Sequence, residues 1–599
     1  MKLELQDTPE ARTSGYCMLP LLQINDLQIE FPGKDGTAKA VYNSNFSIMP
    51  GRLTAIVGES GSGKSVTALS LLQLLPKQTV IKGEILFSED EKRSQDLAKL
   101  SEKEIRDIRG NKIAMIFQEP MTSLNPVYTC GDQVMESLVK HKKISKASAK
   151  NQVLALFVQV ALPKPAEIFN RYPHQLSGGQ KQRVMIAMAM SCDPAILVAD
   201  EPTTALDVRV QKNILQLIKG LQEQNNMAVL LITHDLALVA DMADEVIVMY
   251  KGQIVEQGTA KEVLQSPRHA YTKALLACRP GAGSKGKRLP VISDFIDREN
   301  IHDVVDNNTS NGIKDVQEIL SEDTHNGDSI SLMEKQAILS VENLTVCFPD
   351  KRNIFGKTVS VIPIVKNVSF EVMKNETVGL VGESGCGKTT LGRAILQLIK
   401  PSSGKIVLEG TDLTTLNSEQ LRLIRKNLQI VFQDPYGSLN PRMTIADAIL
   451  EPLNVHQIHY SKKQRKEQVV ELLEKVSLQG DHFNRYPHQF SGGQRQRICI
   501  ARALALQPDF LIFDESVSAL DVSVQAQVLN LINDLKAEMN FSSIFISHDL
   551  SVVHYISDRI LVMNKGRIVE EGSADDIYFN PSNDYTQQLV QAIPGKGLF

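Results

Sequence analysis

The sequence predicts an α/β protein with two tandem domains of the same kind, each built on a mostly parallel sheet. Its length is the first reason, because 599 residues are too many for a single core. The second is a set of motifs that recurs at constant spacing: Ser177 and Ser491 are 314 residues apart (491 − 177), as are Glu201 and Glu515 (515 − 201). A period above 300 residues indicates a duplicated domain, since solenoid repeats are far shorter.

Short apolar runs separated by helical patterns predict parallel strands that are buried on both faces. In the first half the runs are 53–57, 195–199 and 228–232, and in the second half they are 377–381, 510–513 and 544–546. Each run ends at a glycine-rich turn, at an acidic pair or just before a histidine. The carboxyl ends of parallel strands are the usual place for a ligand crevice, so we expect the functional residues to gather there.

The composition limits the classes of protein to which this chain can belong. The chain has 65 basic and 69 acidic side chains and a net charge of −4, which disfavours nucleic acid as a partner. It has no apolar stretch of about 18 residues that could span a bilayer, and its start lacks the apolar core of a signal peptide. Its seven cysteines form no CxxC pair, so we expect reduced thiols in a cytosolic protein.

We place the first domain at 20–280, a linker at 281–336 and the second domain at 337–595. Between residues 291 and 335 there are eleven acidic and three basic side chains, interrupted by Asn307–Gly312. This composition is typical of a flexible or partly ordered acidic linker. A short helix is expected over 313–320.

Two loops follow the phosphate-binding (P-loop) pattern GxxxxGK[ST] after a strand, Gly58–Ser65 and Gly382–Thr389. Glycines let backbone N–H groups surround phosphates, and the helix that follows adds its positive N-terminus. We expect Lys64 and Lys388 to neutralise the β- and γ-phosphates of the nucleotide. The expected nucleotide-binding residues of these loops, with the next residue of each helix, are Gly58, Ser60, Gly61, Gly63, Lys64, Ser65, Val66, Gly382, Ser384, Gly385, Gly387, Lys388, Thr389 and Thr390.

An acidic pair follows a buried strand in each half, Asp200–Glu201 and Asp514–Glu515. The first carboxylate of each pair is expected to hold Mg²⁺, directly or through water, together with the hydroxyl of Ser65 or Thr389. The second carboxylate is placed to orient or deprotonate an attacking water. A lone acidic pair would more often be a cap or a salt bridge; here both lie downstream of a P-loop.

A third motif opens with Ser-Gly-Gly-Gln in both halves, at Ser177, Gly178, Gly179 and Gln180 and at Ser491, Gly492, Gly493 and Gln494. Each copy lies more than 100 residues after its own P-loop and precedes a basic helix start. A Ser-Gly-Gly turn at a helix start exposes N–H donors that suit an anion. A glycine turn with no role in binding would explain one copy of the motif, but not two copies that have the same neighbouring motifs.

Together these motifs resemble a fused pair of ATP-binding cassette (ABC) nucleotide-binding domains, over nearly the whole chain except the linker and the first residues. The resemblance implies P-loop NTPase domains, each with an antiparallel β subdomain and a helical subdomain. It also implies that the Ser-Gly-Gly-Gln signature of one domain closes over ATP on the P-loop of the other. Site one would then combine Gly58–Ser65 with Ser491–Gln494, and site two Gly382–Thr389 with Ser177–Gln180.

The same resemblance assigns further residues. Gln118 and Gln433 correspond to the family's Mg²⁺-contacting glutamine, His234 and His548 to its catalytic switch histidine, and Asp207 and Asp521 to its D-loop aspartate. The aromatic residue that stacks on adenine is not fixed by the sequence. Phe31 and Phe348 lie at similar places ahead of the loops and Tyr42 competes with them, while core packing is the alternative for all three.

Finer motifs resemble the oligopeptide, dipeptide and nickel importer branch of the family: Phe117–Pro126, Phe432–Pro441 and Ser266–Thr272. This implies an ATP-hydrolysing motor subunit at the cytoplasmic face of a bacterial inner membrane. Its partners would be two integral-membrane permeases and, indirectly, a periplasmic or extracellular solute-binding protein; its cargo would be glutathione or short peptides. Only Cys278 follows Tyr271 in the first half and no cysteine follows Tyr585, so we expect no iron–sulfur cluster. The alternative function is a soluble ABC ATPase of translation or DNA repair.

Both halves keep the lysine, glutamate, histidine and signature. We therefore expect two sites that both hydrolyse ATP.

Overall fold

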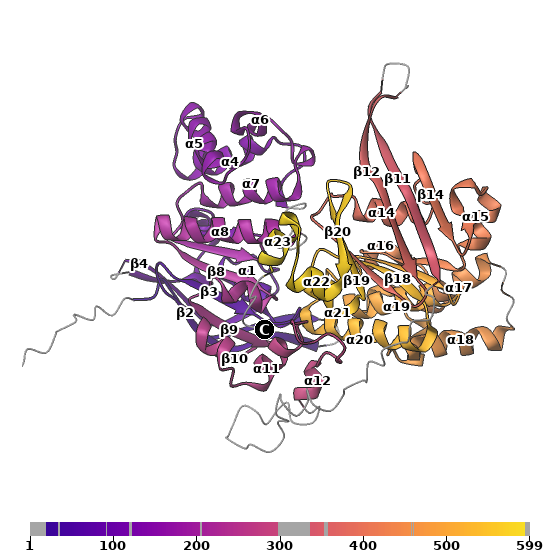
Figure 1. Cartoon of the computed structure of the whole chain (residues 1–599). Helices are drawn as coiled ribbons and strands as arrows, with labels where there is room; N and C mark the ends of the chain where they lie inside the picture. Colours follow the sequence, from indigo (N-terminus) through magenta and orange to yellow (C-terminus); the bar gives the residue numbers. More distant parts are fainter. Residues whose placement is uncertain are drawn as a thin grey trace, which may run out of the picture.

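The computed structural model describes residues 19–33, 36–90, 93–118, 123–203, 206–296, 336–352, 358–456, 458 and 461–593. Figure 1 shows the two halves of the chain side by side, the first coloured indigo to magenta and the second orange to yellow. The helix expected over 313–320 lies outside the described residues. No helix within the described ranges is long and apolar enough to cross a membrane.

A six-stranded sheet forms the centre of each half, with the same strand order in both: β10-β9-β3-β8-β7-β6 and β20-β19-β13-β18-β17-β16. Neighbouring strands pair in parallel except for the last hairpin of each half. The strands are β3 (Leu53–Val57), β6 (Ile113–Ile116), β7 (Ile196–Asp200), β8 (Ala228–Thr233), β9 (Glu245–Tyr250), β10 (Gln253–Thr259), β13 (Thr377–Val381), β16 (Leu428–Val431), β17 (Phe510–Asp514), β18 (Ser542–Ile546), β19 (Arg559–Asn564) and β20 (Arg567–Ser573).

Every residue of β3, β7, β8, β13, β17 and β18 is buried. Layers cover both faces of the sheet, which explains why these strands are continuous apolar runs without the alternation of a half-exposed strand. The six strands expected from such runs are therefore confirmed, with ends that differ by no more than two residues.

A smaller antiparallel sheet accompanies each central sheet, in the order β2-β1-β4-β5 and again β12-β11-β14-β15. Its strands are β1 (Leu22–Gly33), β2 (Gly36–Ile48), β4 (Val80–Asp90), β5 (Arg93–Asp96), β11 (Ala337–Arg352), β12 (Thr358–Met373), β14 (Ser403–Leu408) and β15 (Thr411–Asp412). Its apolar face packs against the central sheet, so Leu22 and Ile56 share one core in the first half, as Leu339 and Leu380 do in the second.

Helices cover the other face of each central sheet and form a group that projects from it, seen at the top of the first half in Figure 1. The helices of the first half are α1 (Lys64–Leu71), α2 (Glu102–Ile108), α4 (Cys130–His141), α5 (Lys146–Gln159), α6 (Pro165–Phe169), α7 (Gly178–Met190), α8 (Val208–Asn225), α9 (Leu236–Ala240), α10 (Ala260–Gln265), α11 (Ala270–Ala277) and α12 (Ile292–Phe295). Those of the second half are α14 (Lys388–Ile395), α15 (Ser418–Ile424), α16 (Pro435–Ser438), α17 (Ile445–Val455), α18 (Lys462–Lys475), α19 (Gly492–Leu504), α20 (Val522–Met539), α21 (Leu550–Ile556), α22 (Ala574–Phe579) and α23 (Asp584–Gln591).

The first part of the segment expected to be linker lies against the second half. Leu289 is buried in the core of that half, and its N–H and carbonyl both bond to the side chain of Asn530, at 3.0 and 2.8 Å. Arg288 pairs with Asp534, and the carbonyl of Lys287 accepts from Tyr555. Residues 287–289 are therefore fixed to the second half, while residues 297–335 lie outside the described residues.

Candidate functional site

Each P-loop joins the end of a central strand to the start of a helix, β3 to α1 and β13 to α14. Gly58 and Gly382 have φ values of 152° and 153°. A Cβ atom on either would lie 2.2 Å from a main-chain oxygen of the neighbouring strand, that of Met249 or Met563. Only glycine therefore fits where the loop passes this strand end, which explains the first glycine of the pattern.

The P-loop lysines are buried and fold back over their own loops. Lys64 Nζ donates to the carbonyls of Gly58 and Glu59 at 2.8 and 2.7 Å, and Lys388 Nζ donates to those of Gly382 and Glu383 at 2.7 and 3.0 Å. Burial lowers the pKa of Lys64, although nearby carboxylates oppose the shift. An ammonium group held inside the loop is positioned to meet an anion that the loop encloses. Val66 and Thr390 lie in the first turns of the helices that follow.

The hydroxyl after each lysine meets the first carboxylate of the acidic pair. Ser65 Oγ lies 3.0 Å from Asp200 Oδ1, and Thr389 Oγ1 lies 2.9 Å from Asp514 Oδ1. Mg²⁺ binds six oxygens in an octahedron at about 2.1 Å, so two neighbouring ligand oxygens lie about 3.0 Å apart. The oxygen–oxygen separation in each half therefore fits two ligands of one Mg²⁺. Burial raises the pKa of Asp200 to about 6 and also raises that of Asp514. These carboxylates would be stabilised as anions by a bound cation.

The second carboxylate of each pair lies between a glutamine and a histidine. Glu201 accepts from Gln118 Nε2 at 2.8 Å and lies 3.4 Å from His234 Nδ1. In the second half, Glu515 accepts from Gln433 Nε2 at 2.7 Å and lies 3.9 Å from His548 Nδ1. The structure therefore brings together the predicted glutamine, glutamate and histidine in both halves. Residues 119–122, which follow Gln118, lie outside the described residues.

Both glutamates adopt a backbone conformation that is uncommon for residues other than glycine. Glu201 has a φ of 45° and Glu515 a φ of 48°. Each is fixed by a bond from its N–H to a strand carbonyl, that of Ile232 or Ile546, at 2.9 Å in both cases. Backbone strain of this kind gathers at functional sites, where it fixes the direction of a side chain.

The histidine and glutamate influence each other's titration. Burial alone would lower the pKa of His234, but its hydrogen bond and charge interaction with Glu201 raise the pKa overall. Burial alone would raise the pKa of Glu515, but His548 and Lys388 lower it overall. The second half thus keeps its glutamate in the form that can accept a proton.

The signature motif is the start of a helix in each half. Ser177 caps α7 and Ser491 caps α19, and each forms a capping box with the glutamine three residues later. The Ser-Gly-Gly turn therefore opens a helix as predicted. The signature glycines pack on the next long helix: a Cβ on Gly179 would lie 3.0 Å from Val210 of α8, and one on Gly493 would lie 2.2 Å from Val524 of α20.

The starts of α8 and α20 also touch the P-loop of the opposite half. Ser60 Oγ donates to Asp521 Oδ1 at 3.1 Å, and Ser523 donates to Glu59. On the other side, Arg209 Nη1 lies 2.7 Å from Glu383 Oε1. Because each signature packs on the helix that makes these contacts, the signature of one half lies beside the P-loop of the other.

The sequence reasoning missed one residue that holds each P-loop. The N–H of Glu59 donates to the Tyr271 hydroxyl at 3.0 Å, and the N–H of Glu383 donates to the Tyr585 hydroxyl at 3.0 Å. Tyr271 is fully buried, and burial raises its pKa. The two tyrosines are 314 residues apart (585 − 271), and that shared spacing is the signal that could have found them.

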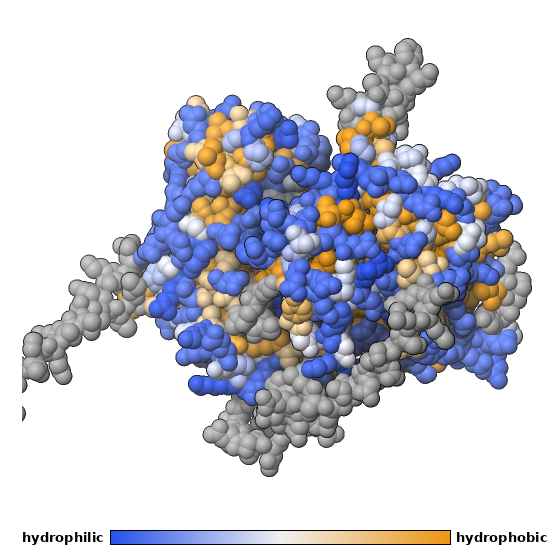
Figure 2. Space-filling model, viewed as in Figure 1, coloured by the Kyte–Doolittle hydropathy of each residue, from blue (hydrophilic) through white to orange (hydrophobic). Residues whose placement is uncertain are grey.

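The adenine-stacking residue stays unassigned. Phe31 is partly buried against the core, which favours packing, whereas Tyr42 and Phe348 are exposed. Figure 2 shows apolar residues gathered at the stem of the β11–β12 hairpin, where Phe348, Val361 and Ile362 are exposed.

Glu59 should make stability depend on pH. Burial first, and then the charge of Asp521, raise its pKa from 4.5 to about 7. A raised carboxyl pKa stabilises the folded chain fully below pH 4.5, and this contribution is lost as pH rises through about 7. We expect Glu59→Gln to gain about 1–2 kcal/mol relative to wild type between pH 5 and 8, after allowance for solvent screening. Denaturant unfolding at both pH values would measure this gain.

The measurement at pH 5 is the internal control, since glutamine and a protonated glutamate are then alike in charge. If the curves of unfolding free energy against pH stay parallel for the wild type and Glu59→Gln, the raised pKa of Glu59 is refuted.

Family models match the chain in both halves. One described as ABC transporter matches residues 41–204 and 365–518, and one described as Oligopeptide/dipeptide transporter, C-terminal region matches 255–295 and 569–596. The chain therefore belongs to the ABC transporter family of ATPases, in the branch that carries the oligopeptide/dipeptide transporter C-terminal region. It is an ATP-binding enzyme with two cassette domains, as the sequence predicted.

The chain is similar to glutathione import proteins. The Glutathione import ATP-binding protein GsiA of Salmonella choleraesuis (strain SC-B67) is 45% identical over 577 residues, which cover 96% of this chain and 89% of that protein. GsiA of Pectobacterium atrosepticum is 43% identical over 583 residues, covering 96% and 90%. A dimeric post-hydrolysis structure of an ATP-binding cassette with ADP and phosphate is 28% identical, covers 39% of this chain and 98% of its own, and has a TM-score of 0.36.

Proposed function

We propose that the chain is the motor subunit of an importer for glutathione or short peptides, with two composite ATP sites between its halves. Site one pairs the P-loop of the first half with the signature of the second, and site two is the reverse. The observation that carries this proposal is the contact of each P-loop with the helix on which the opposite signature packs, through Ser60 and Asp521 at site one and through Glu383 and Arg209 at site two.

At site one, Lys64 and the loop N–H groups bind the β- and γ-phosphates. Ser65 and Asp200 would hold Mg²⁺ with Gln118, and the metal would supply charge neutralisation. Glu201 accepts the proton of the water that attacks the γ-phosphate. His234, 3.4 Å from Glu201, keeps the carboxylate oriented. Site two repeats this arrangement with Lys388, Thr389, Asp514, Gln433, Glu515 and His548.

The conformational change driven by ATP is transmitted to two separate membrane permeases. The chain associates with these permeases at the cytoplasmic face of the inner membrane. A solute-binding protein outside that membrane delivers the cargo. Glutathione is favoured over longer peptides by the names of the relatives. The alternative, a soluble ATPase of translation or DNA repair, is not favoured, because the matched C-terminal region is that of oligopeptide/dipeptide transporters.

Uptake in cells tests the importer. A strain that lacks this gene should lose uptake of labelled glutathione, regain it with the wild-type chain, and fail to regain it with the Glu201→Gln, Glu515→Gln chain. Uptake of a labelled dipeptide in the same strains distinguishes the two cargoes. Unchanged uptake of both, with the chain recovered on ribosomes or DNA, would refute the importer.

Crosslinking tests the composite sites. Cysteines at positions 60 and 521, in a Cys347→Ser background because Cys347 is the natural cysteine that is not buried among those described, should be joined by a short bifunctional reagent. Peptide mass mapping identifies the joined pair. Failure to join them with and without ATP would refute the arrangement of site one.

A further inference from the structure

The second residue of each P-loop is held from two sides. Its main-chain N–H donates to a tyrosine hydroxyl from the C-terminal region of its own half, at 3.0 Å for both Glu59 and Glu383. Its carboxylate reaches the first turn of the long helix of the opposite half, α20 or α8. One residue therefore links a P-loop, its own C-terminal region and the opposite half.

The partner of this carboxylate differs between the two sites. Glu383 pairs with the Arg209 guanidinium at 2.7 Å, whereas Glu59 accepts from the Ser523 hydroxyl. Arg209 and Ser523 are equivalent positions, because they are 314 residues apart (523 − 209), the spacing of the two glutamates of the acidic pairs (515 − 201). Site two thus has an ion pair where site one has a neutral donor.

The neighbouring D-loop aspartates differ as well. Asp521 accepts from Ser60 of the opposite P-loop at 3.1 Å and makes no cap bond to its own helix. Asp207 instead accepts from the N–H of Val210 at 2.9 Å and so caps α8. Site one is therefore joined by two hydroxyl–carboxylate contacts.

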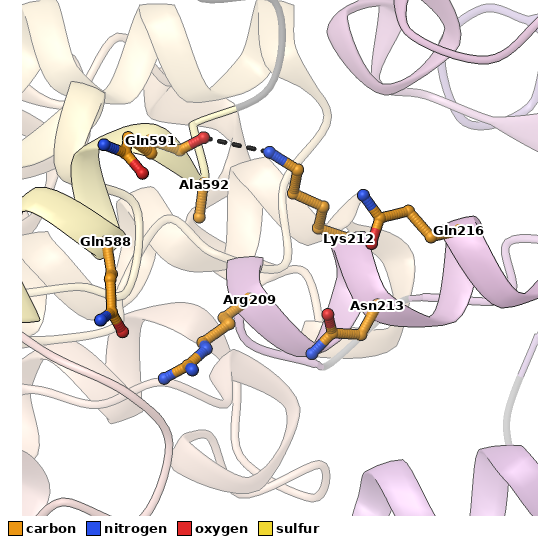
Figure 3. A pocket seen from close by; sticks show the side chains of 7 residues that line it. All are labelled: Arg209, Lys212, Asn213, Gln216, Gln588, Gln591 and Ala592. Carbon is orange, nitrogen blue, oxygen red and sulfur yellow. Dashed lines mark hydrogen bonds between the residues drawn. The ribbon is translucent and has the colours of Figure 1, made fainter. Parts of the chain in front are cut away.

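The ion pair of site two lies beside an open pocket of about 320 Å³ between α8 and α23. Figure 3 shows Arg209 and Lys212 on α8 facing Gln588 and Gln591 on α23, with Lys212 Nζ donating to the Gln591 carbonyl at 3.1 Å. The Arg209 side chain is 49% exposed and that of Glu383 is 32% exposed. Dissolved ions can therefore reach this pair and weaken it.

We propose that Glu59 and Glu383 are positioning residues that hold each P-loop against the opposite half, and that the two sites are closed by unlike contacts, hydroxyl at site one and ionic at site two. This inference rests on the proposed composite sites. Nucleotide binding at site two then depends on Arg209 and weakens with salt more steeply than at site one. The two sites are both competent but unequal in how readily they close.

The test measures nucleotide binding at each P-loop separately in the full chain. Photolabelling with Mg²⁺ and 8-azido-ATP, followed by peptide mapping, gives the concentration for half-maximal labelling of each half. Arg209→Ser should raise this concentration about threefold for the second half relative to the first. ATPase turnover at saturating ATP should change less than this ratio, since the contact acts on closure and touches no reacting atom.

A charge swap and a change of salt concentration keep the test independent of folding. Arg209→Glu should weaken site two further by repulsion, and adding Glu383→Arg should restore binding toward the wild-type ratio. Raising NaCl from 50 to 300 mM should shift the ratio of the two half-maximal labelling concentrations in the wild-type chain in the same direction as Arg209→Ser does. In the Arg209→Ser variant the same rise in NaCl should leave this ratio unchanged.

Lys219→Ser is the matched control, since Lys219 is another cation of α8 and pairs with Asp244 of its own half. An equal shift with Lys219→Ser, an unmoved ratio with Arg209→Ser, or a charge swap no better than Arg209→Glu would overturn the inference. If the wild-type chain is labelled by 8-azido-ATP and hydrolyses ATP, these results would leave the proposed function intact. A wild-type chain that neither labels nor hydrolyses would instead overturn the proposed function itself.

Discussion

Replacing both Glu201 and Glu515 by glutamine is expected to reduce ATP hydrolysis about 10²–10⁴-fold, because each site loses the group that accepts the proton of water. Glutamine matches the shape of glutamate, so the neighbouring Gln118 and His234 at site one keep a partner. Each single substitution should remove at least the turnover of its own site. Steady-state phosphate release by the purified chain would measure this.

ATP binding should survive these changes, which separates a lost base from a lost fold. Glu223→Gln, which alters an exposed carboxylate at the far end of α8, is a suitable control and should leave turnover unchanged. Full wild-type turnover in either single variant would contradict two hydrolysis-competent sites.

The second large effect is expected from a single methyl group in the P-loop. Gly58→Ala places a Cβ 2.2 Å from the Met249 carbonyl and 2.9 Å from Ser62 Oγ. Since a main-chain oxygen cannot rotate away, the loop must move relative to β9. A displacement of about 1 Å at a binding site can cost about a hundredfold, so we expect ATP affinity at site one to fall by that order.

The same loop supplies the control. Gly61 also has a positive φ, of 82°, but a Cβ there has nothing within 4 Å. Gly61→Ala should cost only backbone strain, about 1–2 kcal/mol. Titration with a fluorescent ATP analogue in a Lys388→Ala background compares the two variants at site one, with melting temperatures recorded in parallel. Equal affinities for both variants would show that the contact with Met249 does not hold the loop in place.

The sequence was sufficient for the elements whose signal is local. The apolar run 53–57 is β3, and the run 510–513 lies within β17, because strands covered on both faces need uninterrupted apolar residues. Ser177 and Ser491 cap helices, as a Ser-Gly-Gly turn predicts. The acidic pair, glutamine and histidine of each half come together because they lie at the ends of neighbouring strands.

Contacts between distant segments had no local signal. Ser523 and Glu59 are 464 residues apart, and nothing in either neighbourhood indicates that they touch. Leu289 is one apolar residue beside a polar, acidic segment, so its burial in the second half depends on the matching amide of Asn530. The adenine contact also could not be assigned, because exposed aromatic residues have the same sequence signal whether they bind a base or not.

Residues 287–289 have a consequence for how far the two halves can separate. Leu289 is held in the second half by burial and by two hydrogen bonds to Asn530, and Cys278, which directly follows α11 of the first half, is buried in the same core. Nucleotide release should therefore leave the two halves joined at this anchor, so that each closure re-forms its contacts within one molecule.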